Sequence, residues 1–365
     1  MKLALPQLPQ LNFSLGSRNR PLVGLDITTS SIKLIELTKS GDGYRVEAYA
    51  AEPTPHSAIN EKAIVDAEAV GEAIKRAIKR SGARAKEAAV AISGDAAITK
   101  LIQMPLALSA RDLEAQVELQ ADQYIPFPME EVSYDFEVIG PSEKDPEMQD
   151  VLLVATRTEN VDQRQAAVTA AGLGARIVDV EAFALENACR LMTHQMPDGG
   201  IGRTVAVVDF GASTTTFSVL RDLRVIYTRD FAFGGQQLTE EIMRTYGLSM
   251  EEAGRAKKEG GLPSNYQPEV LDPFIDDMTQ QVSRSLQFYL ASGSGREQPE
   301  QILVCGGCAN IPGVAEVIAS RVGIAAEKGD PLGQMKLSSK AKAMGVKKDA
   351  TALLTACGLA LRSFD

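Results

Sequence analysis

The chain has 365 residues, of which 44% are hydrophobic and 24% are charged, so it is long enough for two globular domains and is not a disordered chain. The formal net charge of −10 argues against a nucleic-acid-binding protein, because neutralising a phosphate backbone requires clustered Lys and Arg.

Several further absences restrict the class of protein. No apolar run approaches the roughly 18 residues of a membrane span, and the two histidines lie far apart, which argues against a histidine metal site or a Ser-His-Asp triad. Four cysteines without disulfide-like spacing fit a reducing compartment. We therefore expect a cytoplasmic protein, and we predict that residues 1–20 form a flexible N-terminal arm.

The first predicted element is a β-meander. An apolar strand ends at Asp26, small hydroxyl residues follow, and a second strand carries Lys33 away from them. A third strand over residues 44–50 follows a polar turn at 40–43. The small residues after the first strand are Thr28, Thr29, Ser30 and Ser31.

The next segment does not repeat later in the chain. After a helix over 66–80, residues 88–140 follow the order strand, strand, helix, strand, with strands at 89–93, 97–104 and 132–139 and a helix at 113–124. A polar loop at 141–150 closes this segment. We predict an inserted subdomain over residues 88–150.

The meander then returns. A strand ends at Asp209, and small residues again precede a second and a third strand. A duplicated meander indicates two related lobes, with the first over 21–87 and 151–194 and the second over 195–365. The small residues of the second copy are Gly211, Ala212, Ser213 and Thr214.

A strand over 301–304 runs into Gly306 and Gly307, close to Ala309. Glycines permit close approach of a flat ring to the backbone. Together with the two meanders they predict a nucleotide site, because backbone N–H groups and hydroxyls of small residues can contact phosphates. Asp26 and Asp209 are expected to hold Mg²⁺, mainly through water.

These three motifs resemble the two phosphate loops and the adenosine motif of the actin-like ATPases, over nearly the whole chain. The inserted αβ subdomain and the segments Gly24–Leu34, Gln120–Pro128 and Gly358–Arg362 are similar to the FtsA/PilM branch, and to the PilM family of type IV pilus assembly proteins in particular. The expected fold is α/β, actin-like (ribonuclease H-like) and duplicated.

The resemblance implies ATP bound between the lobes and a cytoplasmic scaffold at the inner face of the inner membrane. It implies binding of the N-terminal cytoplasmic segment of PilN, for which we nominate residues 97–124. It also implies a nucleotide role for Gly234, Gly235, Glu240 and Lys257, and makes Glu181 a candidate for positioning the attacking water. We expect slow ATP turnover, or none without a partner.

Some points stay open. Thr28 stands where related hairpins usually carry Gly, so its side chain either displaces the loop from the phosphates or adds a hydroxyl. Lys257 is either a nucleotide contact or an exposed helix charge. Cys305 and Cys308 are better explained as small residues in a glycine turn than as a redox or zinc motif. The alternative functions are an FtsA-like polymerising ATPase and an actin-fold small-molecule kinase.

Overall fold

The computed structural model describes residues 21–60, 62–142, 145–293 and 297–365; the arm predicted for residues 1–20 lies outside the described residues. The chain forms two compact units. The first holds the described residues up to Ala188 together with Met335–Val346 and Thr355–Asp365, and the second holds Cys189–Gln334 and Lys347–Leu354. The second unit excludes the C-terminal segment that the sequence grouped with residues 195–365.

The first unit contains a six-stranded sheet in the order β10-β6-β1-β2-β3-β16. Strands β1, β6 and β10 are parallel to one another, whereas β1, β2 and β3 form an antiparallel meander. The carboxyl ends of the three parallel strands therefore lie at one edge of the sheet. The strands are β1 (Leu22–Ile27), β2 (Ser31–Ser40), β3 (Gly43–Pro53), β6 (Glu87–Ile92), β10 (Gly174–Val180) and β16 (Lys336–Leu337).

Helices cover one face of this sheet through a large apolar core. Asp66 caps α1 (Ala67–Ser81) by accepting a hydrogen bond from the N–H of Ala69. Helix α1 and helix α3 (Thr158–Ala170) pack side chains such as Ile74 and Val168 against Leu25 of β1. The small elements β4 (Ile59–Asn60), β5 (Ala63–Ile64) and α9 (Ser339–Ala343) complete this part of the unit.

The opposite face is covered by α4 (Glu181–Cys189) and α10 (Leu354–Leu361). The two helices approach so closely that a Cβ on Gly358 would stand 1.7 Å from the carbonyl oxygen of Ala184. Just beyond α10, the guanidinium of Arg362 donates to the carboxylate of Asp179 on β10 at 2.7 Å, and both side chains are buried. The C-terminal segment is thus tied to the carboxyl end of β10.

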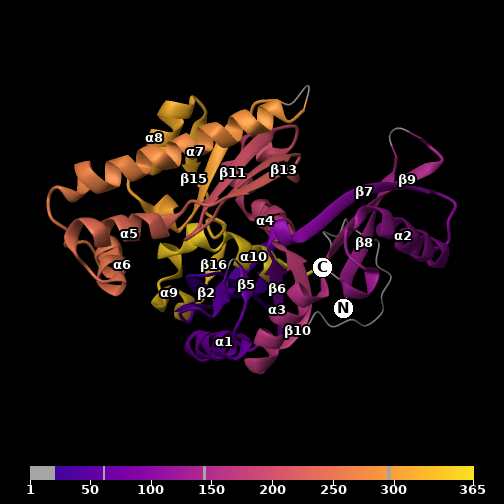
Figure 1. Cartoon of the computed structure of the whole chain (residues 1–365), viewed down its shortest axis with the longest axis horizontal. Helices are drawn as coiled ribbons and strands as arrows, with labels where there is room; N and C mark the ends of the chain where they lie inside the picture. The colour runs from indigo at the N-terminus through magenta and orange to yellow at the C-terminus, as the bar shows by residue number, and fades with distance from the viewer. Residues whose placement is uncertain (1–20, 61, 143–144, 294–296) are drawn as a thin grey trace. The chain divides into compact units, whose positions relative to one another are not determined.

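The inserted subdomain is a three-stranded sheet, in the order β7-β9-β8, packed against α2 (Figure 1). Helix α2 is capped by Ser109, whose hydroxyl accepts from the N–H of Asp112. Its elements are β7 (Ala97–Pro105), α2 (Ala110–Tyr124), β8 (Val132–Pro141) and β9 (Met148–Arg157).

The structure differs from the sequence prediction in this region. The strand expected at 89–93 within the insert is β6, which pairs with β1 and β10 in the main sheet. The residues expected as a loop at 141–150 include the end of β8 and the start of β9. The first difference arises because a short buried strand has the same apolar pattern in either sheet. The second arises because pairing between strands extends β8 and β9 into residues with no apolar pattern.

The second unit contains a five-stranded sheet in the order β13-β12-β11-β14-β15. It repeats the meander, since β11 pairs antiparallel with β12 and parallel with β14. The turn between β12 and β13 places Asp222 and Leu223 in the left-handed region, as two-residue hairpins require. The strands are β11 (Thr204–Phe210), β12 (Thr215–Arg221), β13 (Arg224–Phe231), β14 (Gln301–Gly306) and β15 (Ala325–Lys328).

The helices of this unit share one apolar core with its sheet. A π-helical turn over Gln267–Leu271 leads directly into the helix Asp272–Ala291. The helices are α5 (Gly235–Tyr246), α6 (Met250–Glu259), η5 (Gln267–Leu271), α7 (Asp272–Ala291) and α8 (Val314–Val322).

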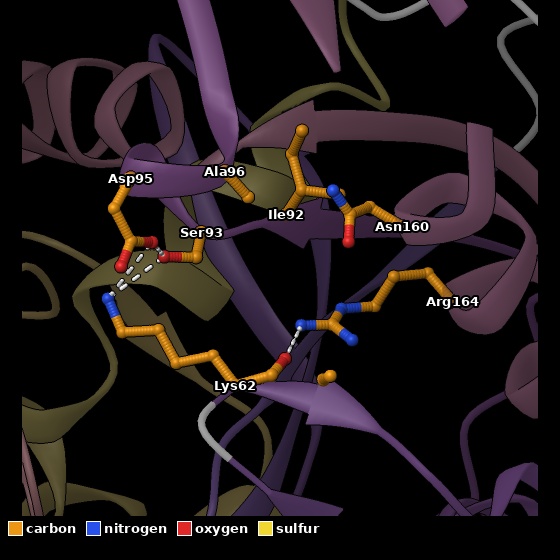
Figure 2. A pocket seen from close by; sticks show the side chains of 8 residues that line it. Lys62, Ile92, Ser93, Asp95, Ala96, Asn160 and Arg164 are labelled. Carbon is orange, nitrogen blue, oxygen red and sulfur yellow. Dashed lines mark hydrogen bonds and ion pairs between the residues drawn. The ribbon is translucent and has the colours of Figure 1, made fainter. Parts of the chain in front are cut away.

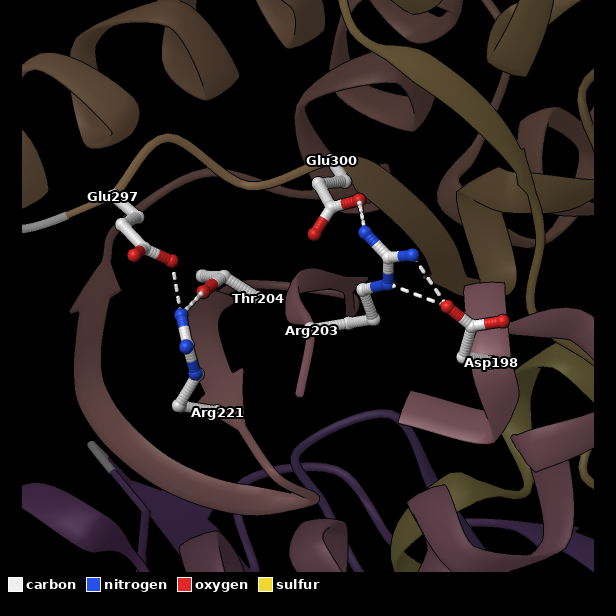
Figure 3. A network of polar contacts seen from close by, with 6 residues as sticks. All are labelled: Asp198, Arg203, Thr204, Arg221, Glu297 and Glu300. Carbon is white, nitrogen blue, oxygen red and sulfur yellow. Dashed lines mark hydrogen bonds and ion pairs between the residues drawn. The ribbon is translucent and has the colours of Figure 1, made fainter. Parts of the chain in front are cut away.

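Polar contacts join the segment that leads into β14 to its neighbouring strands (Figure 3). Arg203 donates to Glu300 at 2.9 Å and also pairs with Asp198. Arg221, at the end of β12, donates to Thr204 at 3.1 Å and pairs with Glu297. Because these groups are largely exposed, each pair adds little to the free energy of unfolding. The pairs hold the strand ends next to one another.

Candidate functional site

The first hairpin carries a buried carboxylate. Asp26 stands near the end of β1, directly opposite Lys33 of β2 in the antiparallel register. It is only 8% exposed, and its Oδ2 lies 2.7 Å from Nζ of Lys33. The first predicted phosphate loop therefore begins with a neutralised ion pair.

The turn after Asp26 is closed by Thr28. Its hydroxyl donates to the carbonyl oxygen of Ser31 at 2.9 Å and accepts from the N–H of Ser31 at 3.2 Å. The hydroxyl of Thr54 holds the turn from outside by donating to the carbonyl of Thr28 at 2.7 Å. The hydroxyl of Thr28 thus stabilises the turn, while Ser30 is exposed and Thr29 half-buried.

The second hairpin is stabilised by a helix instead. The N–H groups of Gly235 and Gln236, in the first turn of α5, donate to the carbonyl oxygens of Gly211 and Ala212 at 3.0 and 2.8 Å. Gly234 is the N-cap residue of this helix. The first turn of α5 therefore fixes the loop that follows Asp209.

The late glycine turn meets the same loop. Gly306 has φ +85°, and a Cβ there would lie 2.2 Å from the carbonyl oxygen of Phe210 and 2.5 Å from Oδ1 of Asp209. Only glycine fits a backbone that combines this angle with such close approach. The hydroxyl of Thr351 donates to the carbonyl of Gly306 at 2.9 Å and holds the turn in place.

Lys257 of α6 lies beside α5. Its ammonium donates to the carbonyl of Gly235 at 2.7 Å and to the hydroxyl of Thr239 at 2.6 Å. Burial lowers the pKa of Lys257, and the neighbouring charge of Lys258 acts in the same direction, against the opposing effect of Cys308. Lys257 is thus held by α5 and is not an exposed helix charge; its contact with a nucleotide stays a prediction.

Cys308 belongs to the wall of this cluster. A Cβ on Gly235 would stand 3.0 Å from its Sγ. Burial raises the pKa of the Cys308 thiol to about 11, although the ammonium of Lys257 acts in the opposite direction. Cys308 is therefore a protonated, packed side chain at neutral pH, and both Cys305 and Cys308 are buried free thiols.

The other predicted residues of the second lobe occupy the rim. Ser213 and Gly307 are exposed, Thr214 is half-buried, and Ala309 is buried. Glu240 is exposed, and its carboxylate accepts from the amide of Gln236 at 2.8 Å. The second unit thus gathers the residues of the second hairpin, the start of α5, Lys257 and the glycine turn in one place.

Glu181 lies in the first unit, as the first residue of α4, immediately after β10. It therefore shares the carboxyl edge of the sheet with Asp26 of β1. A residue that the sequence did not single out, Arg164 of α3, reaches the same edge by donating to the carbonyl of Ala91 at 3.0 Å. Nothing in the sequence pointed to Arg164, because a charged residue within a helical pattern is usually exposed to solvent.

The two related meanders define a duplicated actin-like fold. The ethanolamine utilization protein EutJ from Carboxydothermus hydrogenoformans has the same fold, with 18% identity, a TM-score of 0.54 and coverage of 98% of this chain and 92% of that one. No helix in the described part of the chain is long and apolar enough to cross a bilayer.

Within that fold, the chain belongs to the PilM family of type IV pilus assembly proteins, whose model matches residues 24–364. The structure of a PilM-PilN type IV pilus biogenesis complex is similar, with 27% identity, a TM-score of 0.77 and coverage of 94% of this chain and 99% of that one. The cell division protein FtsA of Bacillus subtilis (strain 168) is 25% identical over 268 residues, or 67% of this chain. The match spans 59% of the length of FtsA.

Proposed function

We propose that this protein is a cytoplasmic, ATP-binding scaffold of the type IV pilus inner-membrane alignment complex, and that it binds the N-terminal cytoplasmic tail of PilN. The observation that supports the nucleotide part is the close approach of the Gly306 backbone to the second hairpin, where a Cβ would lie 2.5 Å from Oδ1 of Asp209, beside a loop fixed by α5. Membership of the pilus assembly family supports the scaffold part.

The second unit is the proposed binding place for the adenosine and phosphate groups of ATP. Its hairpin offers the small residues Gly211, Ala212 and Ser213, so a phosphate can approach the backbone closely. Lys257 has two of its three protons engaged by protein oxygens and retains one for the nucleotide. Gly234, Gly235, Glu240, Gly306, Gly307 and Ala309 line the proposed adenosine side.

In the first unit, the proposed phosphate contacts are Thr28, Thr29, Ser30, Ser31 and Lys33. Asp26 and Asp209 would hold Mg²⁺ mainly through water, because Mg²⁺ retains several of its water ligands. Lys33 would hold a phosphate, and a bound Mg²⁺ would supply the positive charge beside Asp26.

The inserted subdomain has the surface expected of a partner site. Within residues 97–124, Leu101, Leu119 and Tyr124 are 61%, 66% and 43% exposed. Residues 97–157 contain twelve Asp and Glu against four Lys and Arg, a net charge of −8. Cytoplasmic segments next to a membrane span are enriched in Lys and Arg, so this charge favours the tail of an inner-membrane partner.

Binding of a fluorescent ATP analogue with Mg²⁺ tests the nucleotide part. We expect the wild-type chain to bind it and both Asp26→Ala and Asp209→Ala to weaken binding about tenfold or more. Asp42→Ala is the matched control, since Asp42 lies in an exposed turn of the same meander. Equal binding by all four proteins would exclude the proposed site.

Capture by an immobilised synthetic PilN tail tests the partner part. Leu119→Glu and the double substitution Glu114→Lys and Glu118→Lys are expected to abolish capture. Ile226→Glu is the control and is expected to have no effect on capture. It introduces the same charge at an apolar residue of the second unit that is 42% exposed. Unchanged capture by the first two variants would move the docking site away from residues 97–124.

A further inference from the structure

A small pocket lies at the end of β6 in the first unit (Figure 2). Its volume of about 190 Å³ is below the range of about 300–1,000 Å³ that is typical of pockets for drug-sized ligands. Ile92 belongs to its apolar wall, and none of the residues that line it belongs to the proposed nucleotide site. The polar side chains around the pocket are those of Lys62, Ser93, Asp95, Asn160 and Arg164.

Arg164 of α3 brings a buried positive charge to this pocket, since the residue is only 5% exposed. Its Nε donates to the carbonyl of Ala91 at 3.0 Å, and its Nη2 donates to the carbonyl of Lys62 at 2.8 Å. In the part of the chain that the structure describes, these are the hydrogen bonds that Arg164 makes. A guanidinium has five N–H groups, so Arg164 retains donors, including both on Nη1, for a ligand.

The partners of Arg164 also explain why an anion would bind well. Both acceptors are neutral carbonyl oxygens from separate segments, and they hold the planar guanidinium in one orientation. The carboxylates of Glu181 and Asp26 raise the pKa of the guanidinium, but neither residue lines the pocket. A buried cation is stabilised most by an anion that is hydrogen-bonded to it.

Asn160 adds a second donor from the same helix. It precedes Arg164 by four residues and therefore lies on the same face of α3. Its Nδ2 donates to the hydroxyl of Thr156 at 2.9 Å, which uses one of the two N–H groups of the amide. Asn160 also lies in the first turn of α3, at the end of the helix where the backbone dipole favours negative charge.

Lys62 brings the second cation. Its ammonium donates to the hydroxyl of Ser93 at 2.9 Å and lies 3.4 Å from the carboxylate of Asp95. Asp95 opposes an anion, but its side chain is 62% exposed, so solvent weakens its field. Among the described residues that line the pocket, two cations therefore face one exposed carboxylate.

We propose that this pocket binds a small tetrahedral oxyanion of the chemical class of inorganic phosphate and sulfate. The guanidinium of Arg164 presents N–H groups in a fixed fork to the oxygens of such an ion. The amide of Asn160 donates to a further oxygen, and the ammonium of Lys62 adds charge. The inference does not depend on the proposed ATP binding, because the two sites share no residue.

Isothermal titration of the full chain with inorganic phosphate tests the proposal, without Mg²⁺ or nucleotide and at constant ionic strength. We expect one phosphate per chain, similar binding of sulfate, and much weaker binding of acetate and chloride. Arg164→Gln and Lys62→Met are each expected to weaken phosphate binding about tenfold, and Asn160→Leu about fivefold. Lys75→Met, which removes an exposed cation of α1, is the control and is expected to have no effect.

Urea denaturation shows whether each variant folds, because Arg164 also holds two backbone carbonyls. If Arg164→Gln does not fold, Lys62→Met and Asn160→Leu decide the test. Binding that does not saturate, or that acetate and chloride match, would overturn the inference and reveal an adventitious ion only. Phosphate that binds equally well to the folded pocket variants lies elsewhere and would overturn it too. Either result would leave the proposed ATP binding intact, since the fluorescent ATP analogue tests that separately.

Discussion

The two hairpins repeat one motif, yet they are stabilised by different means. In the first, Asp26 faces Lys33 across the strands, and Thr28 closes the turn with its own hydroxyl. In the second, the position facing Asp209 is Thr216, and the loop is held by α5 and Gly306. The first loop is therefore supported by side chains, the second by backbone packing.

This difference has a functional consequence. A loop held by backbone packing is preorganised for a ligand. A loop that begins with an ion pair must exchange partners when a charged ligand arrives. The second hairpin is thus expected to keep its conformation when a ligand binds, and the first hairpin to change its polar contacts.

The largest effect is expected in the second hairpin, from Gly306→Ala. The new Cβ would overlap Phe210 and Asp209 and force a left-handed alanine, so we expect the free energy of unfolding to fall by about 3 kcal/mol. Urea denaturation measures it. Gly307→Ala is the neighbouring control, since a Cβ there meets nothing within 4 Å; equal effects would show that the packing at Gly306 is unimportant.

The second-largest loss of stability is expected in the first hairpin. Lys33→Met leaves the nearly buried carboxylate of Asp26 without its 2.7 Å partner, and we expect a loss of about 2 kcal/mol in urea denaturation. Thr216→Val, at the equivalent position opposite Asp209, is expected to cost less than about 1 kcal/mol. If Thr216→Val lowered the free energy of unfolding more than Lys33→Met does, the first hairpin would not be the one that depends on a side-chain pair.

These particular residues also show what the sequence could reveal. Asp26, Asp209 and Gly306 were recognisable because a strand that ends in Asp, followed by small residues, is a local pattern. For Lys257 the sequence left two roles open, because whether its side chain folds back onto α5 depends on how the helices pack.

Other features required the three-dimensional structure. Nothing local distinguishes β6 as a central strand of the main sheet. The return of α10 to the first unit depends on the close approach of Gly358 to Ala184 and on the pair of Arg362 with Asp179. Each of these contacts joins residues more than 170 positions apart in the chain. The sequence therefore showed Gly358 and Arg362 only through the family resemblance, and did not show which residues they contact.

A smaller effect tests how Thr28 works. Thr28→Val keeps the shape of the side chain and removes the hydroxyl that bonds to both backbone groups of Ser31, so we expect a loss of about 1 kcal/mol in urea denaturation. Ser30→Ala, at the exposed residue of the same turn, is the control. A Thr28→Val chain as stable as wild type would mean that the turn does not depend on this hydroxyl.

The smallest effect on stability at neutral pH is expected from Cys308, which lies beside the second hairpin. Burial raises the pKa of its thiol to about 11, above the roughly 8.5 of an unfolded chain. The unfolded chain therefore releases this proton first, so the thiol's contribution to stability is complete below about pH 8 and is lost as the pH rises towards 11.

Wild type and Cys308→Ala should consequently show a constant difference in the free energy of unfolding up to about pH 8. The difference should then shift against wild type by up to about 3 kcal/mol between pH 9 and 11. Urea denaturation of both proteins at each pH measures this, since other titrating groups are common to the pair. A difference independent of pH would mean that the thiol is open to solvent, and that the glycine turn and α5 do not pack as closely as the second hairpin requires.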